Sequence, residues 1–147
     1  MTDDMSARLP TIGLMLGDVT GIGPEISAKM LATGAASRAH ARVAVIGDAR
    51  VLELGARDAG VKLAWRAYET MEGIEWSHPD LPLIDLANID PARFERGAVS
   101  PESGRLTGET LKYMIELALV GRLDGICFAP LNKGGLHQGG WKFHGER

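Results

Sequence analysis

The sequence is poor in cysteine, in aromatic residues and in long apolar runs, and each shortage excludes a class of protein. Cys127, the one cysteine, excludes an internal disulfide and fits a reducing cytoplasm, and its apolar neighbours predict a buried, unreactive thiol. Only 5% of the residues are aromatic, too few and too scattered for a base-stacking surface. No run approaches the roughly 20 residues of a membrane span. A net charge of -3 argues against nucleic acid or an acidic membrane as partner. A soluble, cytoplasmic protein with a small-molecule substrate is expected.

Strand-like and helix-like segments alternate along the chain. The patterns predict strands at 11–16, 42–46, 61–68, 83–86 and 124–129, and helices at 24–31, 49–58, 106–120 and 132–138. Asp48 is placed to cap the second helix and Gly60 to end it. This alternation predicts an α/β fold with a mostly parallel sheet and helices on both faces. Residues 88–105 contain several prolines and glycines and predict a long connection, of a length that is usually functional or mobile.

The most informative motif is GDVTGIGPE at residues 17–25, between the first strand and the first helix. Three glycines in seven residues allow backbone conformations that a Cβ forbids, and Pro24 suits the first turn of a helix. A strand, a glycine turn and a helix in this order bring backbone N–H groups close to an anion. A tight turn without a ligand explains the pattern equally well, because the spacing differs from G-x-G-x-x-G.

The motif GDVTGIGPE closely resembles the GDPAGIGPE signature of the 4-hydroxythreonine-4-phosphate dehydrogenase (PdxA) family. It resembles more distantly the GDGIGPE of the isocitrate and isopropylmalate dehydrogenases. A second motif, DGICFAPLNK at residues 124–133, is similar to the family's strand that ends in T-A-P-[IV]-N-K. The resemblance implies an isocitrate/isopropylmalate dehydrogenase-like fold. Family members are roughly twice this long, a size that usually means two domains. Residues 1–147 are therefore expected to be the N-terminal part of a two-domain dehydrogenase, truncated before its metal-binding region.

The resemblance also implies an activity. Members of the family oxidise and decarboxylate a phosphorylated hydroxy acid, here 4-phosphohydroxy-L-threonine or a threonate or erythronate 4-phosphate, in or near pyridoxine biosynthesis. They use NAD or NADP, a choice that the sequence leaves open, and a divalent metal such as Zn, Mg or Co. The metal's histidine ligands belong to the part of the family's chain that is absent here, so no metal ligand is assigned and the fragment alone is expected to be inactive. A homodimer is implied for the full-length protein.

The resemblance assigns Asp18, Gly21 and Gly23 to the surroundings of the cofactor. The residues alone favour a simpler role for Asp18, a hydrogen bond within its own turn. Asn132 and Lys133 follow a strand expected to be central, and they are predicted to bind the substrate, although a lone lysine is more often a solvated surface residue.

The last residues depart from the family's G-H-T-E, whose His and Thr contact the substrate. With a two-residue deletion, His144 and Glu146 align with the family's His and Glu, and both are predicted to bind the substrate. Without gaps, Glu146 and Arg147 take the places of His and Thr. No catalytic residue is assigned. The departure leaves two alternatives open: a dehydrogenase of the same fold for an unphosphorylated diol carboxylate, and a non-catalytic phosphate- or nucleotide-binding module.

Overall fold

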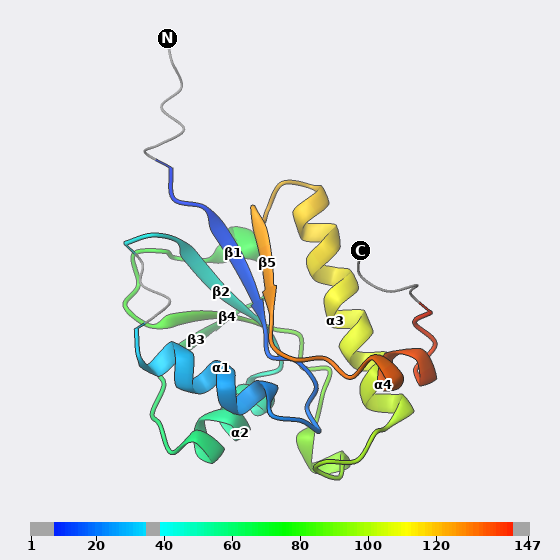
Figure 1. The fold of residues 1–147 in the computed structure, drawn as a ribbon. Coiled ribbons are helices and arrows are strands. Elements are labelled where there is room, and N and C mark those ends of the chain that lie inside the picture. The colour runs from blue at the N-terminus through cyan, green and yellow to red at the C-terminus, as the bar shows by residue number, and fades with distance from the viewer. Residues whose placement is uncertain (1–7, 35–38, 143–147) are drawn as a thin grey trace.

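Five parallel strands form one sheet in the order β3-β4-β2-β1-β5 (Figure 1). The computed structural model describes residues 8–34 and 39–142. The strands are β1 (Thr11–Met15), β2 (Arg42–Gly47), β3 (Trp65–Tyr68), β4 (Leu81–Asp85) and β5 (Gly125–Phe128). The helices are α1 (Gly23–Ala32), α2 (Ala49–Ala59), α3 (Pro101–Leu119) and α4 (Lys133–Gln138), with short 3-10 turns η1 (Met71–Gly73) and η2 (Pro91–Arg93). None of the described helices combines the length and the hydropathy needed to cross a membrane.

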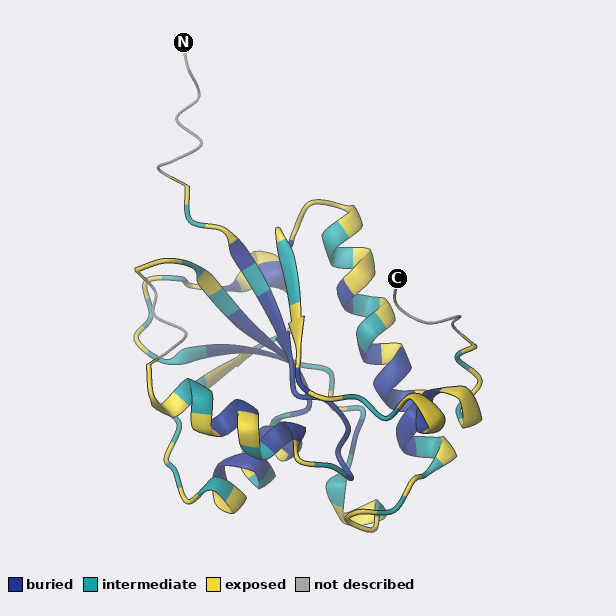
Figure 2. Cartoon of the chain, viewed as in Figure 1, coloured by how far each residue is buried: buried dark blue, intermediate teal, exposed yellow. Residues whose placement is uncertain are grey.

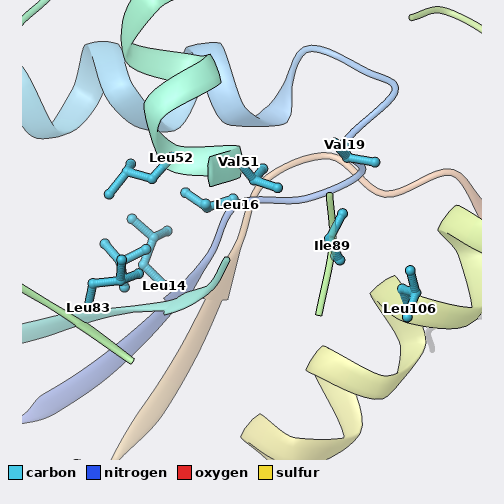
Figure 3. Close-up of a cluster of buried hydrophobic side chains, with 9 residues drawn as sticks. Leu14, Leu16, Val19, Val51, Leu52, Leu83, Ile89 and Leu106 are labelled. Atoms are coloured by element: carbon cyan, nitrogen blue, oxygen red, sulfur yellow. The ribbon is translucent and has the colours of Figure 1, made fainter. Parts of the chain in front are cut away.

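Helices cover both faces of the sheet, as the sequence predicts (Figures 1 and 2). Successive strand residues point to opposite faces, so Leu14 and its neighbour Val45 pack toward α1 and α2. Figure 3 shows the cluster of buried apolar side chains on this face, which includes Leu14 of β1 and Val51 and Leu52 of α2. Met15 and Ile46 pack on the other face, toward Met114 of α3. Burial on both faces explains why β1, β2 and β4 read as largely apolar runs.

The two signals predicted for α2 are confirmed. Asp48 accepts a hydrogen bond from the Arg50 N–H at 2.9 Å, and Gly60 ends the helix with a left-handed φ of 67°. Asp48 is only 1% exposed, and its second oxygen accepts bonds from the Ile89 N–H and the Arg50 guanidinium, both at 2.9 Å. One carboxylate therefore joins the start of α2 to the chain that follows β4.

The Asp48 cap predicts an acid-sensitive contribution to stability. Burial by itself raises the pKa of Asp48, but hydrogen bonds from the Arg50 side chain and from two backbone N–H groups outweigh it and lower that pKa below the ordinary 3.8. Because the folded-state pKa is lowered, the carboxylate stabilises the fold above pH 3.8, and this contribution is lost as the pH falls through the lowered value. Asp48→Asn is expected to lower the free energy of unfolding by about 2 kcal/mol at neutral pH.

Urea denaturation from neutral pH down through pH 3.8 measures the free energy of unfolding of Asp48→Asn and of the wild type. The difference between these two free energies should shrink on acidification. Asp90→Asn is the matched control, because this exposed carboxylate lies 3.7 Å from Arg50 and should contribute less than about 1 kcal/mol. Equal losses in the two variants would contradict the role given to Asp48.

Several boundaries differ from the prediction. The helix α3 begins at Pro101 and not at Leu106, because Ser100 caps it and Pro101 occupies its first turn, which shortens the long connection before it. The third strand begins at Trp65, and the fourth strand begins at Leu81 and contains Pro82. The short turns η1 and η2 were not predicted, because three residues give no periodic pattern.

The predictions of a buried Cys127 and of a central fifth strand are both wrong. In the described part of the chain β5 pairs only with β1 and lies at the edge of the sheet, which leaves Cys127 exposed and Phe128 partly exposed. An apolar strand sequence does not distinguish a central strand from an edge strand whose outer side is open.

Candidate functional site

The two sequence motifs meet at the carboxyl end of the sheet. β1 and β5 are parallel neighbours, so the loops that follow them leave the sheet side by side. The Asp18 N–H donates to the Pro130 carbonyl at 3.3 Å, and the Ala129 N–H donates to the Met15 carbonyl at 3.1 Å. Gly17 permits this approach, because it has a φ of 84° and a Cβ there would lie 2.7 Å from the Pro130 oxygen. Segments more than a hundred residues apart in the sequence thus form one surface.

A pocket of about 290 Å³ lies between these loops. Residues from three segments line it, within 18–22, 97–99 and 130–132. The third segment, 97–99, is held in place by the Gly97 N–H, which donates to the Thr20 carbonyl at 2.8 Å. Ligands of open parallel sheets bind beyond the carboxyl ends of the strands, and the pocket lies there. We take it as the candidate site.

Asp18 organises the glycine turn. Its Oδ1 accepts hydrogen bonds from the Thr20 N–H at 2.9 Å and the Thr20 hydroxyl at 2.8 Å, which confirms the bond within its own turn. The Gly21 N–H donates to the Asp18 carbonyl at 3.1 Å and is therefore not open to an anion. Gly23 does not line the pocket, and its missing side chain lets the start of α1 pack against the Leu16 carbonyl. Of the three residues assigned to the cofactor, Asp18 and Gly21 border the pocket.

Asn132 and Lys133 separate in the structure although they are adjacent in the sequence. Asn132 lines the pocket and caps α4, because its Oδ1 accepts a hydrogen bond from the Gly135 N–H at 2.9 Å. Lys133 is the first residue of α4, is exposed, and does not border the pocket. His144 and Glu146 lie outside the described residues.

Close glycine contacts between α3 and α4 fix the position of Asn132. Gly104 of α3 faces the Gly135 carbonyl of α4 so closely that a Cβ would overlap it. The Trp141 Nε1–H donates to the Arg105 carbonyl at 3.0 Å, and the Trp141 ring lies directly against Gly108 of α3. Helices that approach through glycine cannot slide without a backbone clash, so this contact holds one wall of the pocket.

The sequence reasoning missed the segment 97–99, Thr20 and the apolar rim of the pocket. Ile22 is 60% exposed and Val99 is 49% exposed, although both are large apolar residues. The glycines and prolines of the connection pointed to a functional loop, but no local signal tells which strand end a loop will cover. Exposed apolar side chains at a pocket rim are available to cover a ligand.

A second cavity, of about 350 Å³, lies at the opposite end of the sheet, where Arg42 begins β2 and Leu81 begins β4. It is larger than the candidate site, but neither sequence motif reaches it. Arg42 lies over the ring of Trp76 at 5.6 Å from its centroid. We favour the smaller pocket, because in parallel sheets the amino ends of the strands rarely carry the ligand.

Across residues 8–34 and 39–142, no three histidine, cysteine, aspartate or glutamate side chains gather in a way that could hold a metal ion. The described residues therefore offer no site that fits the metal implied by the resemblance.

Comparisons with known proteins agree with this architecture. The sequence profile of the family described as "Pyridoxal phosphate biosynthetic protein PdxA" matches residues 39–147. The chain is 40% identical to the D-threonate 4-phosphate dehydrogenase of Cupriavidus necator over 142 residues, which is 97% of this chain and 42% of the relative. The crystal structure of a 4-hydroxythreonine-4-phosphate dehydrogenase from Burkholderia phymatum superposes with a TM-score of 0.84 at 37% identity, covering 95% of this chain and 42% of that one.

A more distant solved structure extends the range of substrates among the similar proteins. It is a terephthalate 1,2-cis-dihydrodiol dehydrogenase from Burkholderia xenovorans, with a TM-score of 0.66 and 25% identity, covering 89% of this chain and 37% of that one. The chain spans about two fifths of the length of the relatives it matches.

Proposed function

We propose a dehydrogenase function for this chain, which belongs to the PdxA family of pyridoxal phosphate biosynthetic proteins. Residues 1–147 would form the N-terminal part of a two-domain enzyme that oxidises and decarboxylates a phosphorylated hydroxy acid. The proposed substrates are D-threonate 4-phosphate, its erythronate counterpart and 4-phosphohydroxy-L-threonine. The observation that carries the proposal is the 40% identity to a D-threonate 4-phosphate dehydrogenase over almost the whole chain.

The proposed reaction uses NAD or NADP, whose nicotinamide ring accepts the hydride from the secondary alcohol. The oxidised hydroxyl is on the carbon next to the one that bears the carboxylate. Its oxidation therefore yields a β-keto acid, which loses CO₂. The pocket between the two motifs supports this assignment, because Asp18 and Asn132 place polar groups beside an apolar rim, the composition of many cofactor sites. A divalent metal would be held by residues of the full-length protein outside 1–147. Lys133, His144 and Glu146 remain predicted contacts to the substrate.

One observation favours a second substrate class. The terephthalate 1,2-cis-dihydrodiol dehydrogenase shares this fold, and its named substrate is an unphosphorylated diol carboxylate. The departure from G-H-T-E at residues 143–146 falls on residues that contact the substrate in the family. An unphosphorylated diol carboxylate is therefore the second candidate.

Formation of reduced cofactor, followed by its absorbance, tests the proposed function. The full-length protein is supplied with NAD or NADP, a divalent metal and each candidate: D-threonate 4-phosphate, 4-phosphohydroxy-L-threonine and a cis-dihydrodiol carboxylate. We expect metal-dependent turnover of a phosphorylated substrate and none by residues 1–147 alone. Turnover of only the dihydrodiol would replace the first candidate with the second. Phosphate or nucleotide binding without any turnover would make the protein a binding module.

A homodimer and a cytoplasmic location are also proposed for the full-length protein, from the family resemblance and the low cysteine content. Sedimentation analysis at several protein concentrations tests the dimer, and a monomer at all of them would contradict it.

A further inference from the structure

We propose that Asp18 and Asn132 bind the carboxamide of the nicotinamide ring and that the charge of Asp18 makes the pocket reject the corresponding nicotinic acid cofactor. The inference rests on the proposed function, since it requires a nicotinamide cofactor.

Asp18 supplies a hydrogen-bond acceptor that the turn does not use. Both bonds from Thr20 go to Oδ1, and no described residue donates to Oδ2. Asp18 is 5% exposed, and the only fully enclosed side-chain oxygen or nitrogen without a partner among the described residues belongs to Asn88. Oδ2 of Asp18 therefore keeps contact with open space, and Asp18 is one of the residues that line the pocket. A carboxylate oxygen in this position accepts an N–H or O–H from a ligand.

Asn132 supplies the complementary donor. Its Oδ1 is occupied by the Gly135 N–H, which fixes the orientation of the amide group. No described residue accepts a hydrogen bond from its Nδ2, and Asn132 borders the same pocket as Asp18. The pocket thus offers one anionic acceptor and one neutral donor whose positions are set by bonds to the protein's own backbone.

A primary carboxamide matches this pair, because it carries N–H donors and one carbonyl acceptor on a single carbon. Its NH₂ group would donate to Asp18 Oδ2, and its carbonyl would accept from Asn132 Nδ2. A nicotinamide ring also needs apolar contacts for its flat faces. Ile22 and Val99 are exposed at the pocket, and their side chains could cover one face of the ring. At about 290 Å³ the pocket is near the lower end of the usual range for ligands, which suits a single ring and not a whole dinucleotide.

The same geometry disfavours a carboxylate in place of the carboxamide. Nicotinic acid would bring a second negative charge next to Asp18, a carboxylate that is itself almost fully buried, and would have no N–H to donate. Like charges brought together at an interface cost several kcal/mol, and an acceptor facing an acceptor adds to the penalty. The pocket should therefore prefer NAD to its nicotinic acid analogue by at least about tenfold.

Titration calorimetry of the full-length protein with NAD and with nicotinic acid adenine dinucleotide measures this preference without relying on turnover. Asp18→Asn keeps an Oδ1 that can accept from Thr20 and replaces the free acceptor with a donor. It is expected to weaken NAD binding and to reduce the preference about tenfold or reverse it. Asn132→Asp keeps the α4 cap and is expected to weaken the binding of both cofactors. Glu53→Gln, an exposed change on α2 that alters the net charge equally, should leave the preference unchanged.

The outcomes separate this inference from the proposed function. Equal affinity of the wild-type protein for the two cofactors would overturn the carboxamide assignment and leave the dehydrogenase proposal standing, and this result needs no variant to fold. An unchanged preference in Asp18→Asn would likewise remove Asp18 from the site. If neither NAD nor NADP binds to the wild-type protein, the proposed function fails and the inference fails with it.

Discussion

Gly23→Ala is expected to lower the free energy of unfolding by about 3 kcal/mol, because it forces a methyl group into the backbone beneath the glycine turn. A Cβ at this position would overlap the Leu16 carbonyl oxygen and would lie 3.2 Å from the Ala129 Cβ. Neither the end of β1 nor the Ala129 segment can yield easily, because the two are joined by hydrogen bonds between the loops. Shifting α1 outward is the remaining response, and it would also displace Ile22 from the pocket rim.

Gly21→Ala is the matched control from the same turn. The nearest atom to a Cβ on Gly21 is the Asp18 carbonyl oxygen at 3.7 Å, an ordinary contact. This variant should change the free energy of unfolding by less than about 0.5 kcal/mol. Urea denaturation of the two variants and the wild type gives the comparison. Similar values for both variants would show that the turn does not need glycine at position 23 for packing.

Gly104→Ala is the second change with a large expected effect. A Cβ on Gly104 would overlap the Gly135 carbonyl and lie 2.9 Å from the Leu136 nitrogen, so α4 must move away from α3. Backbone atoms cannot rotate out of the way as a side chain can, and a loss of about 3 kcal/mol in the free energy of unfolding is expected. Because α4 follows directly from Asn132, the variant should also alter the pocket wall and weaken ligand binding.

Gly135→Ala tests the same contact from its other side. The Gly135 carbonyl faces Gly104, but the nearest atoms to a Cβ on Gly135 belong to the Asn132 side chain, at 3.7 Å, an ordinary contact. Alanine is also a better helix former than glycine by about 1 kcal/mol, so this variant should be neutral or slightly stabilising. Thermal denaturation of the pair should show a lowered midpoint for Gly104→Ala alone. A comparable loss for Gly135→Ala would contradict the asymmetry of the contact.

Local chemistry explains which parts of the fold could be predicted from the sequence. The α2 cap at Asp48 and its end at Gly60 are set by neighbouring residues, and both predictions hold. The Ser100-Pro101 start of α3 was also a local signal, and it was outweighed by the glycines and prolines around it. The position of β5 at the sheet edge depends on strand order, which local patterns do not encode, and the prediction for Cys127 failed for that reason.

The candidate site was predictable in part. The sequence places the first motif directly after a strand and the second at the end of another strand, and the bond from the Asp18 N–H to the Pro130 carbonyl joins them. The contribution of residues 97–99 could not be predicted, because it depends on where a long connection crosses the sheet. The separation of Asn132 from Lys133 follows from the cap of α4, which turns one side chain to the pocket and leaves the next one exposed.

The most direct test of the central claim is hydrogen exchange of the protein with and without a saturating nicotinamide cofactor. We expect slower exchange in the three segments that form the pocket, 18–22, 97–99 and 130–132. The cavity at the amino ends of the strands serves as an internal reference, and residues 75–78 that line it should be unaffected. Protection of that cavity, with unchanged exchange around the glycine turn, would contradict the placement of the functional site.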